Sequence, residues 1–139
     1  MEKSIASCLQ KTYTLSEAKM LNPLTLAYIG DGVFSEFIRK YLVAKGLSNV
    51  NHLTKESIKY VKADAQSKII LGLMDTLTDE EQTLVKRGRN THSHPPKNAK
   101  TSDYRYATGF ETLLGFLNLT GQNERLEALI IKGIMLIET

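Results

Sequence analysis

The sequence predicts an all-α fold, and three observations support this prediction. Apolar residues recur every three or four positions over several segments, which places them along one face of a helix. Two segments, 14–17 and 78–81, carry the Thr-x-x-Glu pattern of a helix capping box. No segment of convincing length alternates between apolar and polar residues, as a half-buried β-strand would.

Length and composition are those of one globular domain, predicted to span residues 1–139, with 42% hydrophobic and 24% charged residues. No apolar run approaches the roughly 18 residues of a membrane span, and the N-terminus lacks the apolar core of a signal peptide. Cys8 is the only cysteine, which excludes a disulfide framework and favours the cytoplasm. The net charge of +3 is too small to indicate nucleic-acid binding by itself.

The first long helix is predicted over 23–45. Asn22 is a suitable N-cap, Pro23 fits the first helical position, and Gly46 offers a left-handed stop. Before it, residues 1–13 are expected to be loosely ordered and residues 15–20 to form a short helix. The apolar stripe of the long helix consists of Leu24, Ala27, Tyr28, Phe34, Ile38 and Leu42.

Four further helices are predicted to complete the fold. Residues 49–53 form a turn, and Thr54 caps a helix over 55–74. The inner face of that helix consists of Ile58, Val61, Ala65, Ile69 and Leu73. The remaining helices are expected over 79–87, 103–120 and 123–137, the second of them capped by Ser102 and ended by Gly121.

Asp31 lies in the middle of the first long apolar stripe. An ionised carboxylate that faces a core costs several kcal/mol unless a partner compensates it. Glycine on both sides, at 30 and 32, leaves space for a bulky or hydrated group, although each glycine weakens the helix by about 1 kcal/mol relative to alanine. The structural alternative is that Asp31 accepts a hydrogen bond from a Tyr or Lys of another helix.

Glu111 is a second acid that interrupts an apolar helix, with the small residues Ala107 and Gly115 one turn away on either side. Small residues allow two helix backbones to pack closely, so Asp31 and Glu111 meet if the two small faces meet. Two adjacent carboxylates need a compensating cation, and oxygen ligands favour Mg²⁺ or Mn²⁺. The alternative for Glu111 is a salt bridge to a lysine.

The segment from Lys86 to Arg105 is basic, contains Pro95-Pro96, and has Asp103 as its only acid. Residues 88–102 are predicted to form a long loop, which suits contact with nucleic-acid phosphates, while a solvated basic loop is the alternative. The loop histidines His92 and His94 favour a polar surface feature over a metal site, because no third soft ligand is evident. The candidate RNA-binding residues are Lys86, Arg87, Arg89, Asn90, Lys97, Asn98, Tyr104 and Arg105.

Four segments resemble the Mini-ribonuclease III family, ribonuclease III relatives that lack the double-stranded-RNA-binding domain. They occur in family order and spacing within residues 20–130. The segments are Leu26-Ala-Tyr-Ile-Gly-Asp31, Lys86-Arg-Gly-Arg-Asn90, Pro96-Lys-Asn98, and Tyr104-Arg-Tyr-Ala-Thr-Gly-Phe-Glu111 with Leu113-Leu-Gly115.

The resemblance implies the helical ribonuclease III endonuclease-domain fold, a homodimer, and Mg²⁺-dependent cleavage of double-stranded RNA. It assigns Asp31 and Glu111 as the catalytic and metal-binding acids. Ala27 and Thr108 stand where full-length ribonuclease III carries further acids, so each metal would have few protein ligands. The implied substrate is a precursor of large-subunit (23S) ribosomal RNA, cut to leave a 5′-phosphate and a 3′-hydroxyl, and a large-subunit ribosomal protein is considered as a partner.

A different function class is a non-catalytic RNA-binding or ribosome-associated helical module, in which both acids are structural. Cleavage of duplex RNA only in the presence of Mg²⁺ supports the enzyme, whereas binding without cleavage supports the module. A purely structural interaction domain would show neither.

Overall fold

The computed structural model describes residues 1–91, 94–97 and 100–139, and in these ranges the chain is helical with no β-strand. The all-α prediction is therefore confirmed. The helices are α1 (Glu2–Gln10), α2 (Leu15–Lys19), α3 (Pro23–Ala44), α4 (Val50–Val61), α5 (Ala63–Leu73), the short 3₁₀ helix η1 (Met74–Thr76), α6 (Asp79–Asn90), α7 (Thr101–Leu119) and α8 (Asn123–Glu138).

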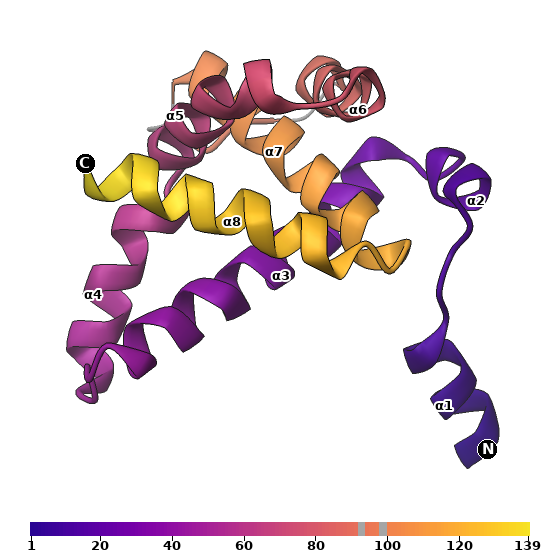
Figure 1. Cartoon of the computed structure of the whole chain (residues 1–139), viewed down its shortest axis with the longest axis horizontal. Coiled ribbons are helices and arrows are strands. Elements are labelled where there is room, and N and C mark those ends of the chain that lie inside the picture. Colours follow the sequence, from indigo (N-terminus) through magenta and orange to yellow (C-terminus); the bar gives the residue numbers. More distant parts are fainter. Residues whose placement is uncertain (92–93, 98–99) are drawn as a thin grey trace.

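Helix α7 is the centre of the molecule, and α3, α5, α6 and α8 pack around it (Figure 1). Phe110, Leu113 and Leu114 of α7 are fully buried, and Phe110 meets Phe34 of α3 edge to face, with ring centroids 5.2 Å apart. A helix that is covered on most sides must be apolar or small almost all round. The sequence fits this requirement over 107–117, where Glu111 is the only residue that is not buried.

Helix α3 begins and ends as predicted. The Asn22 side chain accepts a hydrogen bond from the Leu24 amide at 2.8 Å, Pro23 occupies the first turn, and Gly46 follows the helix with φ 98°. The predicted stripe is confirmed at Phe34, Ile38 and Leu42 but is wrong at Tyr28, which is 80% exposed. Ala27 is also buried as predicted, together with Leu26 and Gly30. Asp31, expected inside the stripe, is exposed and lies on the open face with Tyr28.

The helix predicted over 55–74 is in fact two helices, α4 and α5. The backbone of Lys62 is extended, with φ −64° and ψ 155°, and separates them. The sequence has no glycine or proline at this break. Tertiary packing explains it, because α4 packs against α3 whereas α5 packs against α7 and α8. As a result Ile58, predicted to lie inside, is 51% exposed.

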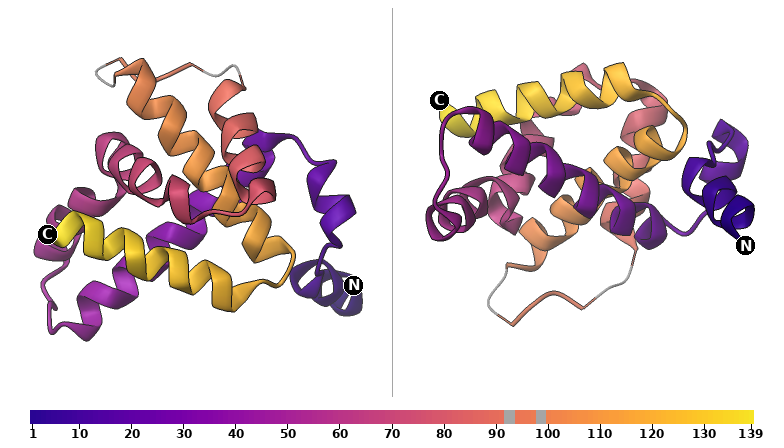
Figure 2. Two further views of the ribbon diagram at one scale, coloured as in Figure 1. Left: turned by 45° about the horizontal axis from the view of Figure 1, so that its top comes forward. Right: turned by 90° about the horizontal axis from the view of Figure 1, so that it is seen from below.

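Two further local predictions are wrong. Residues 49–53 are not a turn, because Asn49 caps α4 by accepting a hydrogen bond from the His52 amide at 3.1 Å, and α4 therefore begins before Thr54. Residues 1–13 are not loosely ordered throughout, because Glu2–Gln10 forms α1, which has no buried residue and lies at one end of the molecule (Figure 2). Within the described ranges, no helix combines the length and apolarity needed to cross a bilayer.

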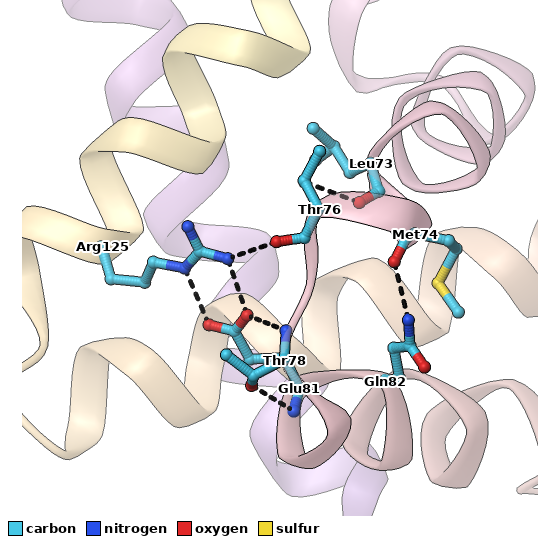
Figure 3. Close-up of polar contacts among 7 residues, drawn as sticks. All are labelled: Leu73, Met74, Thr76, Thr78, Glu81, Gln82 and Arg125. Atoms are coloured by element: carbon cyan, nitrogen blue, oxygen red, sulfur yellow. Dashed lines mark hydrogen bonds and ion pairs between the residues drawn. The ribbon is translucent and has the colours of Figure 1, made fainter.

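The start of α6 is held by a buried ion pair (Figure 3). The capping box at Thr78 and Glu81 is confirmed, with both reciprocal hydrogen bonds present. The same Glu81 carboxylate accepts two hydrogen bonds from Arg125 of α8, at 2.9 and 2.7 Å, and Arg125 also donates to the Thr76 carbonyl at 3.1 Å. Arg125 and the Thr78 hydrogen bonds hold the pKa of Glu81 below its usual value. This contact fixes α6, and with it the basic segment, to the body of the fold.

Candidate active site

The site is built on a very close crossing of α3 and α7. A Cβ atom added to Gly30 would fall far inside contact distance of the Glu111 backbone carbonyl, and one added to Gly115 would do the same at the Leu26 carbonyl. Only glycine permits backbones to approach this closely. The prediction that two small faces bring the helices together is therefore correct. Gly32 has a different environment, since nothing lies within 4 Å of its added Cβ.

The crossing brings the two candidate acids close enough for Asp31 to act on the Glu111 carboxyl. Asp31 is exposed on α3, whereas Glu111 of α7 is half-buried. Burial, and then the hydrogen bond and negative charge of Asp31, raise the pKa of Glu111 to about 8. With this pKa, the Glu111 carboxyl holds a proton near neutral pH unless a cation takes its place. Neither acid forms a lysine salt bridge among the described residues, contrary to the alternative considered for Glu111.

A third polar side chain, Gln66 of α5, reaches the same carboxylate. Its Nε2 lies 3.5 Å from Oε2 of Glu111 and 2.9 Å from the Val61 carbonyl oxygen. Gln66 was missed in the sequence, although it stands at helical spacing with the buried Ile69, Ile70 and Leu73. A polar residue inside an apolar stripe is the same signal that identified Asp31 and Glu111.

The ligand set at the crossing consists of oxygen atoms. Among the described residues, no group of three or more His, Cys, Asp and Glu side chains is close enough to hold a metal ion. Asp31 and Glu111 are thus the two acids available at this point, and they offer hard oxygen ligands of the kind that Mg²⁺ and Mn²⁺ prefer.

The basic residues lie at one end of α7, away from this pair. Arg87, Arg89 and Asn90 occupy the last turn of α6, and Tyr104 and Arg105 the first turns of α7. Residues 94–97, which lie between the two helices in the chain, are placed outside the body of the fold (Figure 2). Glu111 lies six positions after Arg105, which corresponds to a rise of about 9 Å along the helix axis. Tyr104 lies two turns before Glu111 and therefore on the same side of α7.

The ends of α6 and α7 enclose a hollow of about 300 Å³. The Arg89 guanidinium lies 5.6 Å from the centre of the Tyr106 ring, and its Nε donates to Oδ1 of Asn90 at 3.0 Å. In the part of the chain that the structure describes, no carboxylate pairs with an arginine at this hollow. The residues lining it are Arg89, Asn90, Thr101, Ser102, Arg105 and Tyr106.

The remaining candidates are placed as follows. Lys86 and Lys97 are exposed, so both are accessible to a ligand. Asn98 and His92 lie outside the described residues. The loop is shorter than the predicted 88–102, because α6 continues to Asn90 and α7 begins at Thr101 with Lys100, not Ser102, at the N-cap position.

Comparisons with known proteins identify the family. The model of the Ribonuclease III domain matches residues 24–122. Mini-ribonuclease 3 of Thermoanaerobacter sp. (strain X514) is 45% identical to this chain, and the alignment covers 99% of each. The chain belongs to the Mini-ribonuclease III family.

Other members and a solved structure agree. The Mini-ribonuclease 3 of Clostridium tetani (strain Massachusetts / E88) is 48% identical over 94% of this chain and 87% of that protein. A crystal structure of a Fusobacterium nucleatum protein superposes with a TM-score of 0.76 at 28% identity, covering 84% of this chain and 93% of that one. As a member of the Mini-ribonuclease III family, the chain is an endoribonuclease of the ribonuclease III type that acts on double-stranded RNA.

Proposed function

We propose that Asp31 and Glu111 are the catalytic acids of this endoribonuclease and that together they hold Mg²⁺, with Mn²⁺ as a substitute. The observation that carries the proposal is the close α3–α7 crossing at Gly30, which places Asp31 beside the half-buried Glu111. Burial first, and then Asp31, raise the pKa of Glu111 to about 8. Two adjacent carboxylates are difficult to ionise together, and such pairs are typical of a site in which a bound cation neutralises their charge. This favours the enzyme over the non-catalytic RNA-binding module.

The residues at the crossing fit a hard divalent ion. Both carboxylates offer oxygen ligands, and the side chain of Asp31 is exposed, so the site is open to water and RNA. A bound Mg²⁺ supplies an activated water and stabilisation of the leaving oxygen in phosphodiester hydrolysis.

The protein residues orient this reaction. If Asp31 and Glu111 hold the ion as carboxylates, the proton on Glu111 would leave to solvent, because ligand carboxylates must be ionised. In the hydrolysis, the oxygen of a water would form a bond to the phosphorus while the bond from the phosphorus to the 3′ oxygen breaks. The water would lose one proton to solvent, and the released 3′ oxygen would take up one. The products are a 5′-phosphate and a 3′-hydroxyl. The half-burial of Glu111 holds its carboxylate in place while the exposed Asp31 remains accessible to the RNA backbone.

The RNA duplex is proposed to run from the acid pair toward the ends of α6 and α7. Duplex RNA is bound mainly through its shape, phosphates and 2′-hydroxyls, which suits a surface of cations and amide or hydroxyl donors. Arg89, Arg105 and Asn90 line one hollow of this surface. Tyr104 belongs to the same turns of α7, on the side of the helix that carries Glu111. Lys86, Arg87, Lys97 and Asn98 extend the same positively charged segment.

A homodimer is proposed, because ribonuclease III family members typically dimerise. Two acid pairs would then cut the two strands of one duplex. The proposed substrate is a precursor of 23S ribosomal RNA, as the family resemblance implies, with cleavage in the cytoplasm. A large-subunit ribosomal protein as a partner stays a prediction. Light scattering of the purified protein tests the dimer, and mapping of 23S ends in a strain without the gene tests the substrate.

The decisive experiment compares wild type with Asp31→Asn and Glu111→Gln on a labelled duplex RNA, with Mg²⁺ and with EDTA. We expect cleavage by the wild type only with Mg²⁺, products that carry a 5′-phosphate, and a loss of at least a thousandfold in each variant with RNA affinity retained. The matched control is Glu36→Gln, an exposed acid on α3 that pairs with Lys40 at 3.3 Å and should cleave normally. Normal turnover by Asp31→Asn would remove the acid pair from catalysis.

A further inference from the structure

We propose that Gln66 is a positioning residue for Glu111, which orients this carboxylate toward the cation site from the first turns of α5. The inference rests on the proposed function, because it assigns a role relative to the same acid pair. It adds a residue outside α3 and α7, the two helices that carry the acids.

The contacts of the Gln66 side chain define this role. The residue is 3% exposed, and its Nε2 faces two acceptors, the Val61 carbonyl oxygen at 2.9 Å and Oε2 of Glu111 at 3.5 Å. The contact with Glu111 is long, as expected where a carboxylate is free to tighten onto a ligand. Because Nε2 lies on the side of Oε2, a carboxylate that tightens onto a ligand is drawn into one orientation.

The orientation of the amide group follows from the same two acceptors. A flipped amide would point Oε1 at the Val61 carbonyl and at the Glu111 carboxylate, which places oxygen acceptors against one another. With Nε2 facing both acceptors, Oε1 is the atom left buried without a hydrogen-bond partner in the described structure. In this orientation Nε2 serves the Val61 carbonyl and the Glu111 carboxylate, and Oε1 of Gln66 stays unpaired.

This arrangement is not the one that stability alone would select. A buried acceptor without a partner destabilises a fold, whereas an apolar side chain of similar volume at the same place would not. The neighbours of Gln66 on the inner face of α5 are Ile69, Ile70 and Leu73, all fully or almost fully buried. The contact of the Gln66 Nε2 with the Glu111 carboxylate explains why an amide stands among these apolar residues.

The break between α4 and α5 places Gln66 where it can do this. The Val61 carbonyl lies at the end of α4, where helical carbonyls lack intrahelical partners, and the extended Lys62 turns the chain. The Gln66 amide bridges that free carbonyl and the acid of α7. Gln66 thereby connects the Glu111 carboxylate to the rigid α4–α5 joint, in the way that outer ligands orient metal-binding side chains.

The test is Gln66→Met, which keeps the side-chain volume and removes the amide. Mn²⁺ binding is measured by electron paramagnetic resonance on the whole protein without RNA, and cleavage kinetics are measured with Mg²⁺. We expect Mn²⁺ affinity and kcat each to fall by roughly tenfold or more. The KM for duplex RNA should stay the same, and the melting temperature should stay the same or rise.

The control is Gln82→Met on α6, where the glutamine amide donates to the Met74 carbonyl at 2.8 Å, far from the acids along the chain. It should leave Mn²⁺ affinity and kcat unchanged. Gln66→Leu is a second variant, in case methionine prevents folding. A folded Gln66 variant with wild-type Mn²⁺ affinity and kcat would overturn the inference, and so would a loss of activity that only parallels a lower melting temperature.

The outcomes also separate this inference from the proposed function. If Asp31→Asn is inactive while Gln66→Met binds Mn²⁺ and cleaves normally, the acid pair stands and only the role of Gln66 is lost. If Asp31→Asn cleaves normally, the proposed function itself fails.

Discussion

Gly30 of α3 lies directly against the backbone carbonyl of Glu111 in α7. This contact sets the distance between the two helices, and it therefore also sets the distance between Asp31, the next residue on α3, and the Glu111 side chain. A single hydrogen atom in place of a methyl group is what allows the two acids to meet. The contact links the packing of the core to the proposed chemistry.

Gly30→Ala is accordingly expected to damage both stability and activity. The new Cβ would meet the Glu111 carbonyl, a backbone atom that cannot move aside without separating the helices. Overpacking of this kind costs about 1–3 kcal/mol or more of unfolding free energy. Urea unfolding should show this loss, and duplex cleavage should fall by more than tenfold because the acids move apart.

Gly32→Ala is the matched control for this prediction. Its Cβ would have nothing within 4 Å, and alanine is the better helix former by about 1 kcal/mol. We expect unfolding free energy to stay the same or rise. Equal destabilisation by the two substitutions would show that helix α3 does not depend on the close crossing.

The raised pKa of Glu111 predicts a pH dependence of stability in protein freed of divalent ions. The folded state binds a proton at Glu111 with a pKa of about 8, compared with an ordinary value of 4.5. The stabilising contribution is complete below pH 4.5 and is lost as the pH rises toward about 8. The unfolding free energy of the wild type, relative to that of Glu111→Gln, should therefore fall across this window.

Urea unfolding of both proteins at several pH values checks the sign, because titrating groups that do not interact with Glu111 cancel in the difference. Added Mg²⁺ should raise the unfolding free energy of the wild type at high pH, because it binds and stabilises the ionised acid pair of the folded state. A wild-type curve parallel to that of Glu111→Gln would contradict the coupling between Asp31 and Glu111.

Arg125→Met is expected to destabilise the fold by roughly 3 kcal/mol, because it leaves the buried carboxylate of Glu81 without its charged partner. The Arg125 side chain is 30% exposed, so water compensates part of the loss. Lys40→Met is the control, because it breaks an exposed pair with Glu36 and should change stability by less than about 1 kcal/mol. Similar losses in both variants would argue against a special role for the buried pair.

Replacement of a basic residue should change the salt dependence of RNA binding. In EDTA, where no cleavage is expected, Arg89→Ala and Lys97→Ala should each weaken binding and reduce the slope of log K against log salt by about one. Lys132→Ala, an exposed lysine of α8, should leave the slope unchanged. Fluorescence anisotropy of a labelled duplex provides the measurement, and an unchanged slope in both variants would move the RNA path elsewhere.

Much of the fold could be predicted from local patterns in the sequence. Capping residues at Asn22, Thr78 and Glu81 and the left-handed glycine at 46 act within a few residues, so their effect can be deduced without the rest of the chain. The apolar periodicity of α3, α7 and α8 is similarly local. These signals were sufficient for an all-α fold and for the position of most helices.

The candidate site required more than local patterns. The small residues beside the two acids indicated that Asp31 and Glu111 would come together if the two small faces met, and the structure shows that α3 and α7 do cross closely there. The break at Lys62 carried no glycine or proline, and so Gln66 was assigned to one continuous helix. Its contact with Glu111 depends on how α5 packs against α7, which the sequence of α5 does not encode locally.

By itself the sequence determined most of the helices, the caps at Asn22 and Thr78, the small residues and the unusual acids, because each depends on neighbours within about one or two turns. Only the tertiary structure decided which face of α3 is open, where α4 ends, and that Gln66 meets Glu111. Those outcomes depend on side chains far apart in the chain competing for the same buried space around α7. No single residue or local pattern in the sequence predicts the outcome of this packing.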